Sequence, residues 1–164
     1  MQRSQAGESQ QVPVIVVSIF VFIFAAGASL RLYFLDSPIR YDEAFTFMHY
    51  VLLPFNQAIA DYTLPNNHIL HTLLVKITTG VCGREEWAIR LPAFIAGLCL
   101  LPAMFFLGWK AINIRVGLWA AALVAASSGL VEYSVNARGY SMVCLATVLL
   151  LATTKEINLK DHSM

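Results

Sequence analysis

The chain alternates between long apolar runs and short polar segments, a pattern typical of helical membrane proteins. Residues 13–35 and 88–109 form two apolar runs, and each is long enough to cross a bilayer, since a span needs about 20 apolar residues. Residues 117–131 and 140–154 form two shorter runs, so we expect these helices to tilt or to thin the bilayer locally. The pattern predicts an all-α, polytopic membrane helix bundle with about four transmembrane helices.

The segment 36–87 mixes aromatic, charged and proline residues, and we interpret it as an outer loop that carries interfacial helices. Residues 44–53 are amphipathic and predict a short helix with one face toward lipid. Residues 69–81 are apolar but contain His71 and Lys76. A stretch of about 13 residues is too short to cross the hydrocarbon core, so it predicts a helix that lies in the interface or dips into the bundle.

The ends of the chain are polar and divide it into three parts. We expect a disordered cytoplasmic N-terminus at 1–12, a single membrane domain at 13–154 and a cytoplasmic tail at 155–164. The Ala-Gly-Ala run at 26–28 resembles a signal-peptidase cleavage site. Because the apolar run continues past that site, we favour an uncleaved membrane anchor over a cleaved signal peptide.

Basic residues in the short connections predict the orientation. Four of them flank the ends of the later spans: Lys110, Arg115, Lys155 and Lys160. The positive-inside rule places all four on the cytoplasmic side. With 69–81 in the interface, the loops that carry Asp42 and Arg138 then share the outer face. Counting 69–81 as a span would put Lys110 outside, which the same rule disfavours.

Composition narrows the class of protein. Apolar residues make up 58% of the chain and charged residues 13%, with a mean hydropathy of +0.65, whereas an average soluble domain carries about 25% charged residues. A net charge of +1 without a basic block gives no reason to expect a nucleic-acid partner. Cys82, Cys99 and Cys144 are far apart in apolar surroundings, so neither a disulfide framework nor a cysteine metal site is predicted.

Candidate chemistry begins with Asp42 and Glu43, two adjacent carboxylates just beyond the first apolar run. Charges beside a membrane are costly unless they meet a cation, a metal ion or a reacting group. A second polar cluster lies at 136–140 and includes Arg138 and Tyr140. The alternatives are that the carboxylates are solvated or cap a helix, that Arg138 snorkels to the interface, and that Tyr140 is an interfacial anchor.

Other polar residues have weaker signals. His68 and His71 are spaced so that they can face one pocket, although histidines in such positions often serve loops or packing. Arg90 is expected to mark the start of a helix at the membrane surface. Glu132 is a structural candidate that can pair with Arg138.

Four motifs follow one another along the chain. They are the Asp42-Glu43 loop, Asn-Asn-His-Ile-Leu-His-Thr-Leu-Leu at 66–74, Glu-Trp-Ala-Ile-Arg-Leu-Pro-Ala at 86–93, and Tyr-Ser-Val-Asn-Ala-Arg-Gly-Tyr-Ser at 133–141. In this order, over 13–154, the chain resembles the N-terminal part of the GT-C glycosyltransferases that use polyprenyl-phosphate sugars. It is most similar to the bacterial group that resembles protein O-mannosyltransferases, aminoarabinose transferases and lipopolysaccharide galacturonosyltransferases.

The resemblance implies an inverting sugar transfer from a lipid-phosphate carrier to an acceptor hydroxyl at the outer membrane–water boundary. Asp42 takes the position of the catalytic base, with Glu43 beside it. A carboxylate can accept the hydroxyl proton and stabilise the positive charge of the sugar ring, and the planar fork of an arginine suits phosphate. The predicted substrate-binding residues are Arg138, Tyr140, His68 and His71.

The resemblance also implies partners and a location. The donor is a polyprenyl-phosphate-linked sugar, the acceptor a lipid, glycan or protein, and the location the cytoplasmic membrane with the active face outward. No obligatory metal is predicted, because Asp42 and Glu43 offer few oxygens, although some branches of the superfamily use a divalent ion. Family members are longer, so we expect a truncated or split N-terminal module with a missing C-terminal half. The alternative is a noncatalytic membrane fragment or a scaffold partner of another membrane protein.

Overall fold

The computed structural model describes residues 13–61 and 67–161, with side chains described as far as Thr154. Within these ranges the elements are helices: α1 (Val14–Leu35), α2 (Tyr41–Thr46), the π-helix η1 (Phe47–Val51), α3 (Phe55–Ala60), α4 (Ile69–Cys82), α5 (Glu86–Ala111), α6 (Ile114–Ala126), α7 (Ser128–Ser134) and α8 (Tyr140–Asp161). The all-α prediction is confirmed. The predicted N-terminal segment 1–12 lies outside the described residues. The predicted tail begins inside α8, and residues 162–164 are not described.

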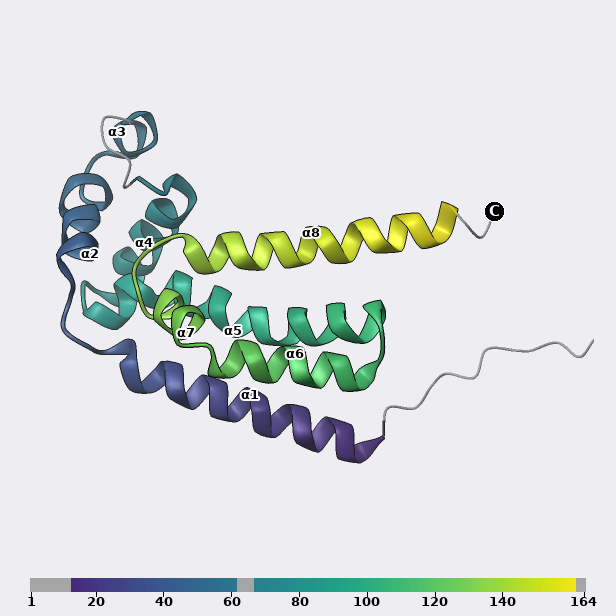
Figure 1. Cartoon of the computed structure of the whole chain (residues 1–164). Coiled ribbons are helices and arrows are strands. Elements are labelled where there is room, and N and C mark those ends of the chain that lie inside the picture. Colours follow the sequence, from purple (N-terminus) through teal and green to yellow (C-terminus); the bar gives the residue numbers. More distant parts are fainter. Residues whose placement is uncertain (1–12, 62–66, 162–164) are drawn as a thin grey trace, which may run out of the picture.

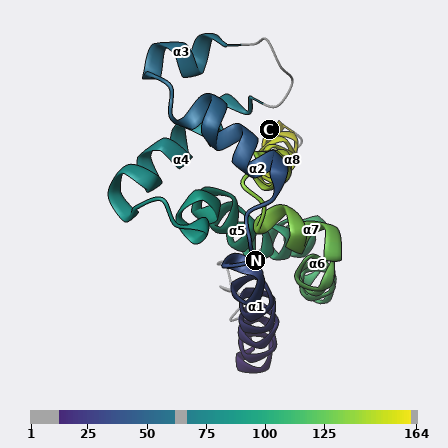
Figure 2. The same cartoon turned by 90° about the vertical axis from the view of Figure 1, so that its left-hand side faces the viewer.

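Helices α1, α5, α6 and α8 run alongside one another and form the bundle (Figure 1). The shorter elements α2, η1, α3 and α4 gather at one end, and α7 lies there too. Helix α4 runs across this end instead of along the bundle, as the view down the bundle shows (Figure 2). The loops before α2 and before α8 therefore meet at the same end, as the spacing of spans predicted, and the α5–α6 turn lies at the other.

In the part of the chain that the structure describes, two helices are long and apolar enough to cross a membrane, α1 with 22 residues and α5 with 26. Helices α6 and α7 meet the same criteria only as a pair, and they are bent by 66° at their junction. Helix α4 and the apolar start of α8 are shorter. The fold is thus a helical membrane bundle, but the predicted span at 117–131 is corrected in one respect, because it is not one straight helix.

A buried arginine stabilises the break between α6 and α7. Arg31 of α1 is 0% exposed and donates to the carbonyl oxygens of Val124 and Ala125 at 3.1 and 3.4 Å. It also donates to Oγ of Ser134, in α7, at 3.1 Å. The last turn of a helix leaves carbonyls without intrahelical partners, and a cation is stabilised there by the helix dipole. Arg31 therefore satisfies the end of α6, where Ser127 has extended backbone.

Small residues bring the bundle helices close together. A Cβ atom at Gly27 would lie 2.8 Å from the Leu101 side chain, and one at Gly117 would lie 2.5 Å from the Phe105 carbonyl oxygen. Close approach of this kind is how helices pack in lipid, where apolar surface gains little by association.

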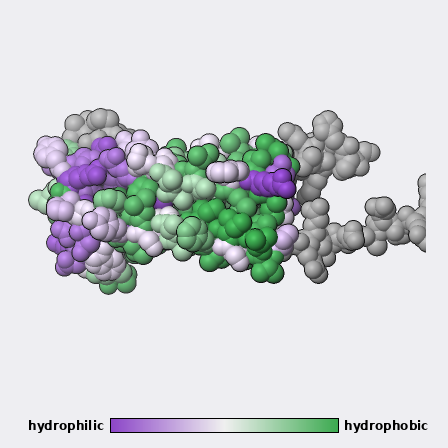
Figure 3. Space-filling view, turned by 60° about the horizontal axis from the view of Figure 1, so that its bottom comes forward, coloured by the Kyte–Doolittle hydropathy of each residue, from purple (hydrophilic) through white to green (hydrophobic). Residues whose placement is uncertain are grey.

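The outer surface has the polarity expected of a membrane protein. Hydrophobic residues cover much of the middle of the bundle, while hydrophilic ones gather over the end that carries α2 to α4 and in a smaller patch at the opposite end (Figure 3). Helix α4 is amphipathic: Leu70, Ile77 and Val81 are exposed, whereas His71 and Val75 are buried. This supports the prediction that the stretch lies in the interface.

The packing of α5 against α7 gives a first prediction. A Cβ at Gly97 would lie 2.0 Å from Oγ of Ser134, the hydroxyl that Arg31 binds. Gly97→Ala should therefore lower the thermal stability of the detergent-solubilised protein, by about 1–3 kcal/mol for overpacking of this kind. Gly80→Ala is the matched control, because nothing lies within 4 Å of a Cβ there. Equal melting temperatures for the two variants would contradict the packing.

Candidate active site

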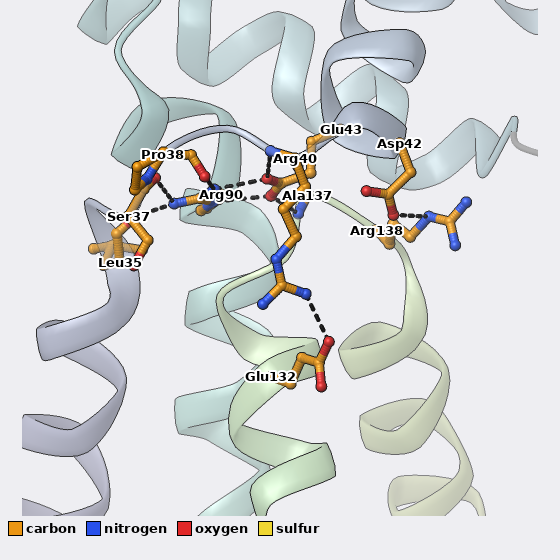
Figure 4. Close-up of polar contacts among 10 residues, drawn as sticks. All are labelled: Leu35, Ser37, Pro38, Arg40, Asp42, Glu43, Arg90, Glu132, Ala137 and Arg138. Carbon is orange, nitrogen blue, oxygen red and sulfur yellow. Dashed lines mark hydrogen bonds and ion pairs between the residues drawn. The ribbon is translucent and has the colours of Figure 1, made fainter.

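Glu43 and Arg90 form a buried ion pair at the end of the bundle (Figure 4). Nε of Arg90 donates to Oε1 of Glu43 at 2.8 Å, and Nη2 donates to Oε2 at 2.6 Å. The two side chains are 2% and 0% exposed. A two-point pair of this geometry is a strong form of charge-assisted hydrogen bonding, and it ties α2 to the first turn of α5.

The remaining donors of Arg90 hold the chain that leaves α1. Nη1 donates to the carbonyl oxygens of Leu35 and Ser37 at 2.9 and 2.6 Å. Nη2 also donates to that of Pro38 at 3.1 Å. Arg90 thus uses all five N–H donors of its guanidinium. Its bonds to three carbonyl oxygens hold the linker between α1 and α2 in place.

The carboxylate of Glu43 is satisfied just as fully. Oε2 also accepts from the backbone N–H of Arg40 at 2.9 Å, and Oε1 accepts from that of Ala137 at 2.7 Å. With the two bonds from Arg90, the carboxylate accepts four hydrogen bonds, about its full capacity. The bond to Ala137 fixes the loop before α8 against the start of α2.

These contacts set the ionisation of Glu43. Burial is the largest influence and by itself would raise the pKa of the carboxyl. The hydrogen bonds from Arg90 and from the amides of Arg40 and Ala137, with the charge of Arg90, together outweigh burial and hold the pKa below its ordinary value of 4.5. Glu43 is therefore charged at neutral pH.

Asp42, the residue before Glu43, forms an ion pair with Arg138. Oδ2 of Asp42 lies 3.2 Å from Nε of Arg138, and the two side chains are 31% and 18% exposed. Nη1 of Arg138 donates to the hydroxyl of Tyr140 at 3.2 Å, and the guanidinium lies 5.6 Å from the centre of that ring. The two polar clusters that the sequence singled out, before α2 and before α8, are thus brought into contact.

His68 joins this group through Tyr140. Their rings meet edge to face, with centres 5.2 Å apart. A Cβ at Gly139 would lie 3.2 Å from His68, so the absence of a side chain allows the close approach. Burial, and then the positive charge of Arg138, lower the pKa of His68.

His71 lies deeper, on the buried face of α4. It is 1% exposed, and neither ring nitrogen has a hydrogen-bond partner among the described residues. Burial, the largest influence, and the neighbouring His68 lower the pKa of His71 to about 4, against a smaller effect of Glu43. The imidazole is therefore neutral at physiological pH.

Comparison with known families identifies the class of protein. Residues 66–163 match the profile of the family described as dolichyl-phosphate-mannose-protein mannosyltransferase. The chain belongs to this family. It is a membrane protein of the GT-C glycosyltransferase type, a class with lipid-linked sugar donors. The searches of curated proteins and of solved structures found no match.

The family match covers part of the site. His68, His71, Arg138 and Tyr140 lie inside the matched segment. Asp42 and Glu43 precede it, so the structure alone links them to the matched residues. In the described part of the chain no three His, Cys, Asp or Glu side chains are placed to hold a metal ion together.

Sequence reasoning missed two pairings in this GT-C protein. Arg90 lies near the start of α5, as expected, but its pairing with Glu43 was not predicted, and its side chain is buried, with the residue 1% exposed. Glu132 was expected to pair with Arg138, whereas it pairs with Arg40 at 2.6 Å, with both side chains about half exposed. A signal for the first did exist, because an arginine at the start of an apolar span requires a partner.

The buried pair gives a second prediction. Arg90→Leu should cost about 3–5 kcal/mol of unfolding free energy, because it leaves the Glu43 charge buried and unpaired. The double variant Glu43→Leu/Arg90→Leu should be more stable than Arg90→Leu alone, measured by thermal unfolding in detergent. Glu132→Gln is the control, since an exposed pair is worth at most about 1 kcal/mol. Additive losses in the double variant would contradict the pairing.

Glu43 also predicts how stability depends on pH. Its folded pKa lies below 4.5, so its ionised form stabilises the fold above that pH, and the contribution is lost as the pH falls further. The melting temperature of the wild-type protein should therefore drop in this acid range. Glu43→Gln should lower the melting temperature at neutral pH and flatten the acid drop. An unchanged acid slope in that variant would show that other carboxylates are responsible.

Proposed function

We propose that the protein transfers a sugar from a polyprenyl-phosphate carrier to an acceptor hydroxyl, with inversion at the anomeric carbon, on the outer face of the cytoplasmic membrane. The observation that carries this is the contact of Asp42 with Arg138 at 3.2 Å. It places a part-exposed carboxylate opposite a cation, which are the two groups that such a transfer requires. Membership of a family with lipid-linked donors supports it.

In this proposal Asp42 acts on the acceptor hydroxyl, and Arg138 acts on the lipid phosphate that leaves. The acceptor oxygen attacks the anomeric carbon and gives its proton to Asp42, while the bond from that carbon to the phosphate oxygen breaks. The electron pair leaves with the lipid phosphate. Arg138 neutralises this charge, and its planar fork fits phosphate oxygens. The hydroxyl of Tyr140, bonded to Arg138, can donate to the same phosphate.

The adjacent carboxylates Asp42 and Glu43 suit different roles in this reaction. The sequence predicts Glu43 as catalytic together with Asp42. Its four hydrogen bonds leave the carboxylate without a free position, which favours a positioning role. Asp42 keeps a 31% exposed side chain, so it can reach an acceptor.

The outward orientation rests on charge and topology. The site lies at the end of the bundle opposite the α5–α6 turn (Figure 1). That turn is flanked by Lys110 and Arg115, and basic residues of this kind favour the cytoplasmic side.

In this scheme Arg138 balances the phosphate charge without an obligatory metal, so transfer should persist in the presence of EDTA.

Asp42→Asn tests the base directly. Transfer of radiolabelled sugar from polyprenyl-phosphate donors, in membranes that contain this chain, should fall about 10²–10⁴-fold, the usual contribution of a general base. Asp36→Asn removes an exposed carboxylate of the same loop and should leave transfer unchanged. Unaltered transfer by Asp42→Asn would exclude it as the base. No transfer by the wild type from any donor would favour the alternative of a noncatalytic membrane module.

Arg138 gives a companion prediction. Arg138→Lys keeps the charge but loses the two-point fork, so transfer should fall less than in Arg138→Gln, which loses both. Glu132→Gln, outside the Asp42–Arg138 contact, should leave transfer unchanged. If Arg138→Lys and Arg138→Gln were as active as the wild type, the phosphate would be bound elsewhere.

A further inference from the structure

His71 is a buried polar side chain without a hydrogen-bond partner among the described residues. It is 1% exposed, and neither of its ring nitrogens has a partner there. A buried polar atom without a partner costs free energy, so folded proteins seldom retain one without a reason. His71 also lines a groove of about 270 Å³ between α4 and α8. The unpaired imidazole and the groove together indicate a place for a ligand.

The groove is mostly apolar and is open at the surface of the bundle. Its polar side chains are those of His68 and His71, and the other residues that line it are Ile69, Leu70, Gly139, Met142, Val143 and Ala146. Leu70 on α4 and Val143 on α8 are 65% and 61% exposed. Exposed apolar side chains on a membrane protein face lipid, so a ligand can enter this groove from the bilayer.

The groove leads from the candidate active site along α8. Gly139 follows Arg138 directly in the chain, and the ring of His68 meets that of Tyr140, whose hydroxyl accepts from Arg138. The lining then continues along α8 as far as Ala146, about two helical turns further on. Helix α8 runs from this end along the bundle (Figure 1). The groove is therefore polar beside the site and apolar along the span.

This arrangement fits an amphiphile whose polar group is a sugar phosphate. A neutral imidazole offers one donor and one acceptor, and His71 is neutral at physiological pH. Phosphate oxygens accept hydrogen bonds and sugar hydroxyls can donate them, so a sugar phosphate supplies both partners that the imidazole lacks. A hydrocarbon chain alone would leave both nitrogens unpaired, and a water-soluble sugar phosphate would not fill the apolar part of the groove.

We infer that the α4–α8 groove receives the lipid carrier. The isoprene units next to the phosphate lie against α8, and His71 hydrogen-bonds the sugar phosphate beside Arg138. This rests on the carrier named in the proposed function and deepens it, because it assigns the path by which the carrier reaches the site from the bilayer. Arg138 then supplies the charge for the phosphate, while α4 and α8 hold the chain.

Substitutions that narrow the groove test the path of the chain. Purified full-length chain in nanodiscs is titrated with radiolabelled undecaprenyl phosphate and with dimethylallyl phosphate, whose short chain would not reach residue 146. Ala146→Trp should weaken binding of undecaprenyl phosphate about tenfold and leave dimethylallyl phosphate unaffected. Leu70→Trp, on the α4 side, should act in the same way. Thr147→Trp is the matched control, because Thr147 is exposed and outside the lining, about 100° around the helix from residue 146.

His71 tests the polar end of the groove. His71→Leu should weaken binding of both phosphates about tenfold, as for the loss of one good hydrogen bond. His71→Gln, which keeps a neutral donor and acceptor, should retain most of the affinity. Because the imidazole has no partner among the described residues, His71→Leu should keep or raise the melting temperature, as is common when a functional polar group is replaced. A lower melting temperature with unchanged affinity would show a structural role instead.

The outcomes separate this inference from the proposed function. If the wild type bound undecaprenyl phosphate and Ala146→Trp and Leu70→Trp bound it equally well, the groove would be overturned while the proposed function stood. If the wild type bound the lipid through the groove but transferred no sugar, the carrier site would stand and the proposed function would fail. If the wild type did not bind undecaprenyl phosphate, both would fail.

Discussion

The buried ion pair of Glu43 with Arg90 is the contact on which the site end of the bundle depends. Removing two charges from water costs several kcal/mol per ion unless hydrogen bonds replace the lost hydration. Here the replacement is complete, because Arg90 uses all five donors and Glu43 accepts four hydrogen bonds. Those bonds join the end of α1, the start of α2, the first turn of α5 and the loop before α8. No one of these segments can shift without breaking a bond to a buried charge.

Two buried arginines are satisfied in different ways, and the difference suits their places. Arg90 faces a carboxylate near the polar end, where several chain segments meet. Arg31 bonds to carbonyl oxygens and a hydroxyl within the bundle, where α6 breaks. The first arrangement fixes irregular segments in place, and the second supplies donors to a helix end that lipid could not satisfy. Arg90 thus holds the end of α1 near the site, and Arg31 holds α1 against the α6–α7 junction.

Environment gives neighbouring groups of the same type different chemistry. Asp42 and Glu43 are adjacent, yet Glu43 is locked by four hydrogen bonds while Asp42 is part exposed and faces Arg138. His68 and His71 also differ: His68 contacts Tyr140 near Arg138, whereas His71 is buried and has no hydrogen-bond partner among the described residues. Rigid support on one side and unsatisfied polar groups on the other are what a preorganised site requires, since binding then needs little rearrangement.

The sequence by itself determined the class of fold, the presence of a helix at α4 too short to span the bilayer, and the common end of the Asp42 and Arg138 loops, because these follow from the length and spacing of apolar runs. It also pointed to the residues of the site through their chemical types. Only the tertiary structure decided the partners: Arg90 with Glu43, Arg40 with Glu132, and Arg31 with the end of α6. Pairing depends on where separate helices place their side chains in space, and neither hydrophobic pattern nor local spacing encodes that position.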